Sequence, residues 1–279
     1  MVPFMRVLSK GQVESYHKNG YCHPIDVFSE TEADELRQCL EHAELEYPDA
    51  LNSTNRNNAH LAFCFLDEIA HNEIILDAVE DLIGPNILLS GSVLFIKDAR
   101  SSSFVSWHQD ATYMGFSSND FVTPWIALTD SNIESGCMRM LLGSHLGPIL
   151  KHEDTFGEDN ILTRGQQIMV LEEERVVNIE LRPGQMSLHH PKVIHSSMPN
   201  QSDSRRIGLA LQSYMSPHTR QTIGKNYALI VRGQDTEGHA LVLQRPDTDM
   251  GQQAVAQRKE VNQNLSSILY QGSSKVRSY

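Results

Sequence analysis

The stretch Trp107-His108-Gln109-Asp110 places a histidine and a carboxylate two residues apart. On an extended segment side chains alternate between two faces, so His108 and Asp110 point to the same side. His195, much later in the chain, supplies a further imidazole. Two imidazoles and one carboxylate can occupy one triangular face of an octahedron and leave three positions open, as in non-haem Fe(II) oxygenases. An H-x-D triplet alone recurs by chance, so its context in the chain decides its meaning.

The composition is that of an ordinary globular protein. The 279 residues carry a formal net charge of -12, with 40% hydrophobic and 21% charged residues, and such a chain can bury a sizeable core. The acidic balance argues against nucleic acid or a membrane surface as a partner. No apolar segment approaches the length of a membrane span. We therefore expect a small molecule as the partner, and the composition fits any oligomeric state.

The cysteines and the first residues of the chain favour a cytoplasmic location. The four cysteines show no C-x-x-C pair and no spacing typical of a disulfide framework, so reduced thiols are expected. Residues 1–12 contain no sustained apolar run of the kind that a signal peptide needs.

Helices are predicted before and after a region of short strands. Residues 9–19, 29–46 and 66–83 combine helical spacing of apolar residues with capping or stop signals. Residues 254–270 read as a terminal helix. The polar residues 47–61 between the second and third helices read as a loop.

The middle of the chain consists of short β-branched or aliphatic runs between turns, which are typical of strands. These runs are residues 21–27, 86–96, 104–109, 121–129, 176–181, 185–190 and 206–214, with edge strands at 227–231 and 240–243. Helices followed by about eight strands predict a mostly β fold with flanking helices, either a β-barrel or a double-sheet jelly roll. The polar insertion 151–166 reads as a lid, and no internal repeat or domain boundary interrupts the chain.

The second half of the site lies in residues 182–200. There a Pro183-Gly184 turn feeds a strand, and the return places His195 where a third ligand can meet the first two. Arg205 and Arg206 follow at the start of an aliphatic strand. An arginine that enters a sheet beside a metal site is costly to bury unless an anion pairs with it. A dicarboxylate supplies that anion in the bidentate geometry that guanidinium favours. In the alternative, both arginines lie on the surface beside a turn.

Several motifs in one order resemble the phytanoyl-CoA dioxygenase family of Fe(II)- and 2-oxoglutarate-dependent oxygenases. They are Trp107-His108-Gln109-Asp110, Trp125, Asn132-Ile133-Glu134-Ser135-Gly136-Cys137, Gly143-Ser144-His145, Pro183-Gly184 and His195-Ser196-Ser197 with Asn200 and Arg206. The specific matches run from about Leu88 to Tyr214. The resemblance implies a double-stranded β-helix (jelly-roll, cupin-like) core at about residues 86–215. A helical part at 1–85 precedes it and a C-terminal extension at 216–279 follows it, within one domain spanning 1–279.

The resemblance also assigns roles around the metal. His108, Asp110 and His195 become the iron ligands and catalytic residues. Arg206 pairs with the distal carboxylate of 2-oxoglutarate, and Arg205 is its adjacent rival, because strand alternation lets only one of them point inward. Ser197 and Trp125 fall where family members line the cosubstrate pocket. Lys97 is also expected to contact 2-oxoglutarate. For Lys97, contact with substrate or exposure to solvent remains an alternative.

The reaction follows from the same resemblance. Fe(II), 2-oxoglutarate and dioxygen serve as metal, cosubstrate and oxidant, succinate and CO2 are released, and an unactivated C–H bond is hydroxylated. Halogenating relatives replace the ligand carboxylate by a small residue so that halide can bind the iron. Asp110 is present here, so hydroxylation is favoured over halogenation.

The substrate is expected to be a small polar or zwitterionic metabolite. Length and N-terminal layout are similar to bacterial hydroxylases of 2-aminoethylphosphonate-type compounds, and an amino acid, a betaine or an acyl-CoA are the alternatives. Two other classes of protein remain as rivals: a zinc or other divalent-metal hydrolase, and a non-catalytic metal-binding jelly-roll module. The candidate substrate residues are Arg56, Asn57, His60, Tyr113 and His190. The adjacent His189 and His190 both fall near the metal. For each of them, a structural role and a substrate-lining role both stay open.

Overall fold

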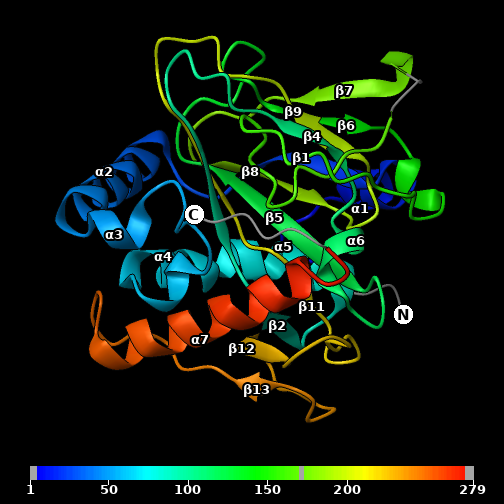
Figure 1. Ribbon diagram of the computed structural model, residues 1–279. Helices are drawn as coiled ribbons and strands as arrows, with labels where there is room; N and C mark the ends of the chain where they lie inside the picture. Colours follow the sequence, from blue (N-terminus) through cyan, green and yellow to red (C-terminus); the bar gives the residue numbers. More distant parts are fainter. Residues whose placement is uncertain (1–4, 170–172, 274–279) are drawn as a thin grey trace.

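The computed structural model describes residues 5–169 and 173–273 (Figure 1). Within them the strands form two sheets. The larger sheet contains β1 (Tyr21–Asp26), β8 (Gln185–His189), β5 (Phe121–Ala127), β10 (Arg206–Ala210), β3 (Val93–Lys97), β11 (Tyr214–Met215), β2 (Ile87–Leu89), β12 (Tyr227–Arg232) and β13 (Leu241–Val242). The smaller sheet has the order β4 (Val105–His108), β9 (His195–Ser197), β6 (Met138–Leu141) and β7 (Val176–Ile179). The predicted jelly-roll core with flanking helices is confirmed.

Most helices come early in the chain, as predicted. The helices of the described residues are α1 (Lys10–Asn19), α2 (Glu30–Glu46), α3 (Pro48–Leu51), α4 (Cys64–Ala70), α5 (Glu73–Ile83), α6 (Ala111–Met114) and α7 (Gln252–Leu269). Short 3-10 turns lie at Ala59–Leu61, Ser144–Leu146 and Glu173–Arg175. Ser9 and Ser29 start α1 and α2 with capping boxes, in which the serine and the Gln12 or Glu32 side chain satisfy each other's backbone N–H groups.

Strand alternation sorts the side chains of the larger sheet between two apolar layers. Along β5, Val122 and Ile126 face the main core, which α2, α4 and α5 cover from outside. Trp125 and Ala127 face the other way, toward Met140 of the smaller sheet and its neighbours. The space between the two sheets is therefore the interior of the jelly roll, and inward-facing residues at its open end can line a site.

Several predicted elements differ in detail. The helix predicted at 66–83 is two helices, because the chain breaks at His71 and Asn72 caps α5 by accepting from the N–H groups of Ile74 and Ile75. The strand predicted at 86–96 is two strands, β2 and β3. The loop predicted at 47–61 contains α3 and a 3-10 turn. Neither β6 nor β9 was among the predicted strands.

The C-terminal helix α7 crosses the lower half of the view in Figure 1 and packs beside the N-terminal loops. Its Arg258 side chain is buried and donates hydrogen bonds to the carbonyl oxygens of Ala50, Asn55 and Asn57. These bonds join α7 to the segment before β2. Within the described part of the chain, no helix has the length and apolar character needed to cross a membrane.

Candidate metal centre and substrate pocket

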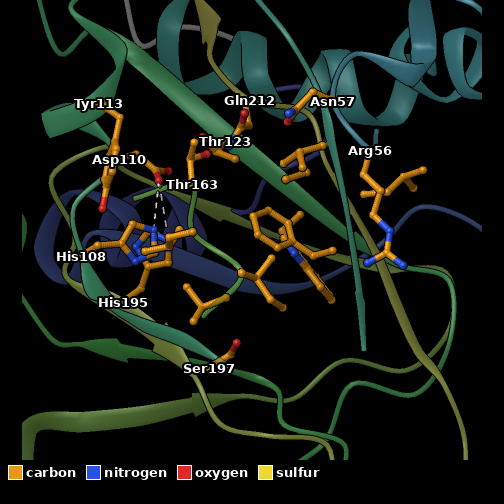
Figure 2. A pocket seen from close by; sticks show the side chains of 18 of the residues that line it. Arg56, Asn57, His108, Asp110, Tyr113, Thr123, Thr163, His195, Ser197 and Gln212 are labelled. Carbon is orange, nitrogen blue, oxygen red and sulfur yellow. Dashed lines mark ion pairs between the residues drawn. The ribbon is translucent and has the colours of Figure 1, made fainter. Parts of the chain in front are cut away.

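Three side chains from separate segments converge at the open end of the jelly roll. His108 ends β4, His195 begins β9, and the two are direct partners in the antiparallel ladder between these strands. Asp110 follows at the start of α6. Asp110 Oδ1 lies 3.4 Å from His108 Nε2 and 3.8 Å from His195 Nε2. One ligand atom from each residue lies within 4.8 Å of the others, so the three side chains can hold one metal ion (Figure 2).

Both imidazoles are oriented by backbone carbonyls. His108 Nδ1 lies 2.9 Å from the carbonyl oxygen of Ser106, and His195 Nδ1 lies 3.1 Å from that of Val193. A carbonyl only accepts, so each Nδ1 carries the proton and each Nε2 keeps its lone pair toward Asp110. This is the tautomer that a metal needs, and partners of this kind also fix the ring orientation.

Burial and mutual proximity set the charge of His195 and Asp110. Burial lowers the pKa of His195 to about 3, so its imidazole is neutral at physiological pH. Burial alone would raise the pKa of Asp110, but the neighbouring His195, His108 and His189 outweigh this effect and hold it well below its usual range. Two imidazoles and one ionised carboxylate suit Fe(II) and leave coordination positions for other ligands.

Arg206 supplies a buried positive charge in the same pocket. Its side chain is 2% exposed, its Nε has no hydrogen-bond partner, and its guanidinium carbon lies 5.2 Å from the Trp125 ring centroid. The indole fits there because residue 208 is glycine: a Cβ at Gly208 would lie 1.9 Å from Trp125 Cζ2. A buried guanidinium without a carboxylate partner is costly. It therefore fits the distal carboxylate of a dicarboxylate such as 2-oxoglutarate.

Lys97 lies beside Arg206 and is fully buried, not exposed to solvent. Its Nζ donates 2.7 Å to Ser197 Oγ, and also to the carbonyl oxygens of Gly136 and Met198. Burial and the nearby Arg206 lower the pKa of Lys97 to about 6. Ser197 lines the pocket, so Lys97 reaches the pocket through the serine hydroxyl.

The pocket extends from the three ligands toward the loop before β2. Arg56, Asn57 and Tyr113, all predicted to contact substrate, line it. Figure 2 shows Arg56 at the end remote from the ligands, with Thr123, Gln212 and Asn57 along one wall. Burial lowers the pKa of Arg56, and the described residues place no carboxylate in ion-pair contact with it. The Tyr113 hydroxyl is buried without a hydrogen-bond partner.

Two predicted substrate residues are not in the pocket. His60 is 1% exposed and lies beneath it, with Nδ1 2.6 Å from Ser92 Oγ. His190 points away because it comes one residue after the end of β8, and its Nδ1 accepts from the backbone N–H of Lys192. The neighbouring His189 lines the pocket instead. The apolar Met186 and Leu188 alternate with Gln185, Ser187 and His189, and this alternation was the signal that could have found His189.

Residues 161–163 of the polar insertion 151–166 line the pocket, and so do Leu265 and Leu269 of α7. Arg164 holds the insertion to α7, because its Nη1 donates to the carbonyl oxygens of Leu269 (3.1 Å) and Gln271 (3.2 Å). The sequence prediction assigned no pocket residue to α7.

The phytanoyl-CoA dioxygenase (PhyH) family profile matches residues 16–208. A probable alpha-ketoglutarate-dependent hypophosphite dioxygenase of Stutzerimonas stutzeri is 32% identical over 151 residues, which are 53% of this chain and 52% of that protein. The peroxisomal phytanoyl-CoA dioxygenase of Bos taurus is 33% identical over 154 residues, 53% of this chain and 44% of that protein. The solved structure of the apo non-heme monooxygenase ThoJ superposes with a TM-score of 0.82 at 32% identity, covering 93% of this chain and 98% of ThoJ.

The chain therefore belongs to the phytanoyl-CoA dioxygenase family. This confirms the resemblance to the family. The relatives above are named as a 2-oxoglutarate-dependent dioxygenase, a phytanoyl-CoA dioxygenase and a non-heme monooxygenase. The chain spans about half the length of the curated relatives that it matches.

Proposed function

We propose that this protein is an Fe(II)- and 2-oxoglutarate-dependent hydroxylase of a small polar metabolite that carries an acidic group. The observation that carries the proposal is that His108, Asp110 and His195 share one pocket with the buried Arg206, which forms no ion pair with any carboxylate among the described residues. A metal-binding triad alone suits many reactions. A triad beside a buried guanidinium suits a metal that shares its site with a dicarboxylate.

The proposed roles divide the pocket into two regions. His108, Asp110 and His195 hold iron, and Arg206 holds the distal carboxylate of 2-oxoglutarate with support from Ser197. Trp125 and Lys97 complete the cosubstrate side. When bound, iron with 2-oxoglutarate and dioxygen supplies an oxidant strong enough to hydroxylate an unactivated C–H bond, with release of succinate and CO2. Because Asp110 provides a carboxylate at the position where halogenating relatives have a small residue, hydroxylation is favoured over halogenation.

The remaining residues of the pocket bind and orient the substrate. Arg56 can pair with an acidic group at the far end, and the free Tyr113 hydroxyl can donate a hydrogen bond nearer the ligands. Apolar side chains exclude water from the reacting carbon. They include Met114, Ile161, Leu162, Leu265 and Leu269.

An aminoalkylphosphonate such as 2-aminoethylphosphonate is the leading substrate in this proposal. Its phosphonate suits Arg56, and its amine can lie against the aromatic ring of Tyr113. The Stutzerimonas stutzeri relative is named for another phosphorus oxyanion, hypophosphite, which supports phosphorus oxyanions as a substrate class. Amino acids, betaines and acyl-CoA thioesters are the alternatives.

The test is succinate formation after dioxygen is admitted to anaerobic protein loaded with Fe(II) and 2-oxoglutarate. The panel contains 2-aminoethylphosphonate, other aminophosphonates, hypophosphite, amino acids, betaines and acyl-CoA thioesters. We expect substrate-dependent succinate with one phosphorus oxyanion and a product heavier by one oxygen atom. Succinate formation with a compound of another class would overturn the proposed substrate class. Absence of succinate with every compound of the panel would overturn the proposed reaction. Tight Zn(II) binding without use of 2-oxoglutarate would favour a hydrolase, and metal binding without turnover would favour a binding module.

A further inference from the structure

His189 is held rigidly beside the metal ligands. It ends β8, which lies between β1 and β5, and it is the ladder partner of Tyr21 on one side and Thr123 on the other. Its side chain is 2% exposed and lines the pocket. Backbone pairing on both sides fixes the position of its Cα, and burial restricts the rotation of its ring.

The two oxygens of Asp110 have different partners. Oδ1 faces the ligand imidazoles of His108 and His195, whereas Oδ2 lies 3.3 Å from His189 Nε2. An ionised carboxylate only accepts, so His189 Nε2–H is the donor. Within residues 5–169 and 173–273, His189 is the hydrogen-bond donor to this carboxylate, and the other contacts are with the two ligand imidazoles.

Asp110 needs such a partner because its backbone does not hold the carboxylate. The residue follows the end of β4 at the first turn of α6, and its side chain makes no capping bond to that helix. A carboxylate on a turn can rotate and offer one or both oxygens to a metal. A donor fixed on Oδ2 leaves Oδ1 as the oxygen that faces His108 and His195.

We propose that His189 is a positioning residue that holds Asp110 Oδ2 and so makes Asp110 a one-oxygen ligand. This inference rests on the metal site of the proposed function. With Oδ2 engaged, the carboxylate takes one coordination position and the remaining ones stay free for 2-oxoglutarate and dioxygen. The second ring nitrogen of His189, Nδ1, has no hydrogen-bond partner, so the contact with Asp110 is the polar role that the side chain fulfils.

The test compares three substitutions by anaerobic Fe(II) titration of the whole chain, followed by the visible absorbance that develops when 2-oxoglutarate chelates the metal. His189→Gln keeps an amide N–H near the position of Nε2, His189→Asn is equally polar but too short to reach Asp110, and His189→Leu has no donor. His190→Asn is the matched control, because His190 follows His189 in the chain but lies outside the pocket, and an asparagine oxygen can still accept the hydrogen bond from the backbone N–H of Lys192.

We expect His189→Asn and His189→Leu to bind Fe(II) about 10–100-fold more weakly, the range typical for loss of a group that orients a ligand. The absorbance of their 2-oxoglutarate chelates should also shift. The Fe(II) affinity of His189→Gln and His190→Asn should stay within a few-fold of that of the unaltered protein. Equal metal affinity in the Gln and Asn variants would overturn the proposal, whether both are weakened or both are unaffected. This comparison remains decisive if the Leu variant does not fold. Absence of metal binding by the unaltered protein would instead refute the proposed function.

Discussion

Arg205 and Arg206 are adjacent at the start of β10, yet their guanidinium groups lie on opposite sides of the larger sheet. Arg206 is buried in the pocket over Trp125. Arg205 forms ion pairs with Glu44 at 2.9 Å and Asp98 at 3.1 Å on the outer side. Alternation along the strand enforces this division. Arg205 therefore has acidic partners within the chain, whereas Arg206 is left for a ligand.

This division gives the first prediction. Arg206→Gln removes a charge-assisted contact worth about 1.5–3 kcal/mol, so the KM for 2-oxoglutarate should rise about tenfold to hundredfold. Arg205→Gln loses partly exposed ion pairs only and should leave that KM within about twofold. Both values come from succinate formation at saturating substrate. An equal effect of the two substitutions would contradict the assignment of Arg206.

Lys97 should make 2-oxoglutarate binding depend on pH. Above pH 6 the buried amine is mostly neutral, because burial and Arg206 lower its pKa to about 6. An anion on Arg206 favours the ammonium form, so binding near pH 7 should take up a proton and tighten as pH falls from about 8 toward 6. Titration calorimetry in two buffers of different ionisation enthalpy counts that proton. Lys97→Met should abolish the uptake, and uptake that persists in this variant would identify another group.

The metal ligands themselves are tested by truncation. His108→Ala or Asp110→Ala should reduce succinate formation to background and weaken Fe(II) binding by more than the about 10–100-fold loss typical of a supporting residue. His42→Ala is the control, because His42 is exposed on α2 and its ion pair with Glu46 lies on the surface. Full activity in either ligand variant would show that the metal binds elsewhere.

Arg164 should control how firmly the insertion 151–166 covers the substrate. Arg164→Met removes the hydrogen bonds to the carbonyl oxygens of Leu269 and Gln271 and the ion pair with Asp154 within the insertion. Amide hydrogen exchange over 151–166 should therefore rise, and the substrate KM should increase about three- to tenfold. The KM for 2-oxoglutarate should stay unchanged, since Arg206 is untouched. Arg100→Met, which loses only an exposed pair with Asp203, is the control. Unchanged exchange would show that the insertion is held by other contacts.

The structure brings together His108, Asp110 and His195, which the sequence suggested as metal ligands, but the reason given for Asp110 was incomplete. Alternation on a strand was expected to align His108 with Asp110. The strand in fact ends at His108, and Asp110 has helical backbone angles of φ -58° and ψ -39°. The side chains still converge because the backbone N–H of Ala111 donates to the carbonyl oxygen of Pro191 and turns the chain. Such a contact between distant residues has no local signature.

The substrate side was harder to predict for the same physical reason. Gln212, Thr163 and Leu269 reach one pocket from three distant segments, and no periodicity connects them. His60 was chosen as a polar loop residue and His190 as a residue near the metal, but each is engaged outside the pocket, His60 with the distant Ser92 and His190 with the backbone of Lys192. Short strands such as β6 and β9 also escaped detection, because three or four residues with serine, histidine or arginine carry little β pattern.

The hydrogen bonds of Arg258 have a consequence for how selectivity can change. They link α7, which contributes Leu265 and Leu269 to the pocket, to the loop that carries Arg56 and Asn57. These bonds join two walls of the pocket, while His108 and His195 are anchored in the ladder of the smaller sheet. Recombination or insertion at the C-terminal end could therefore retune which compound is accepted without disturbing the oxidation machinery, so directed evolution toward new substrates should begin there.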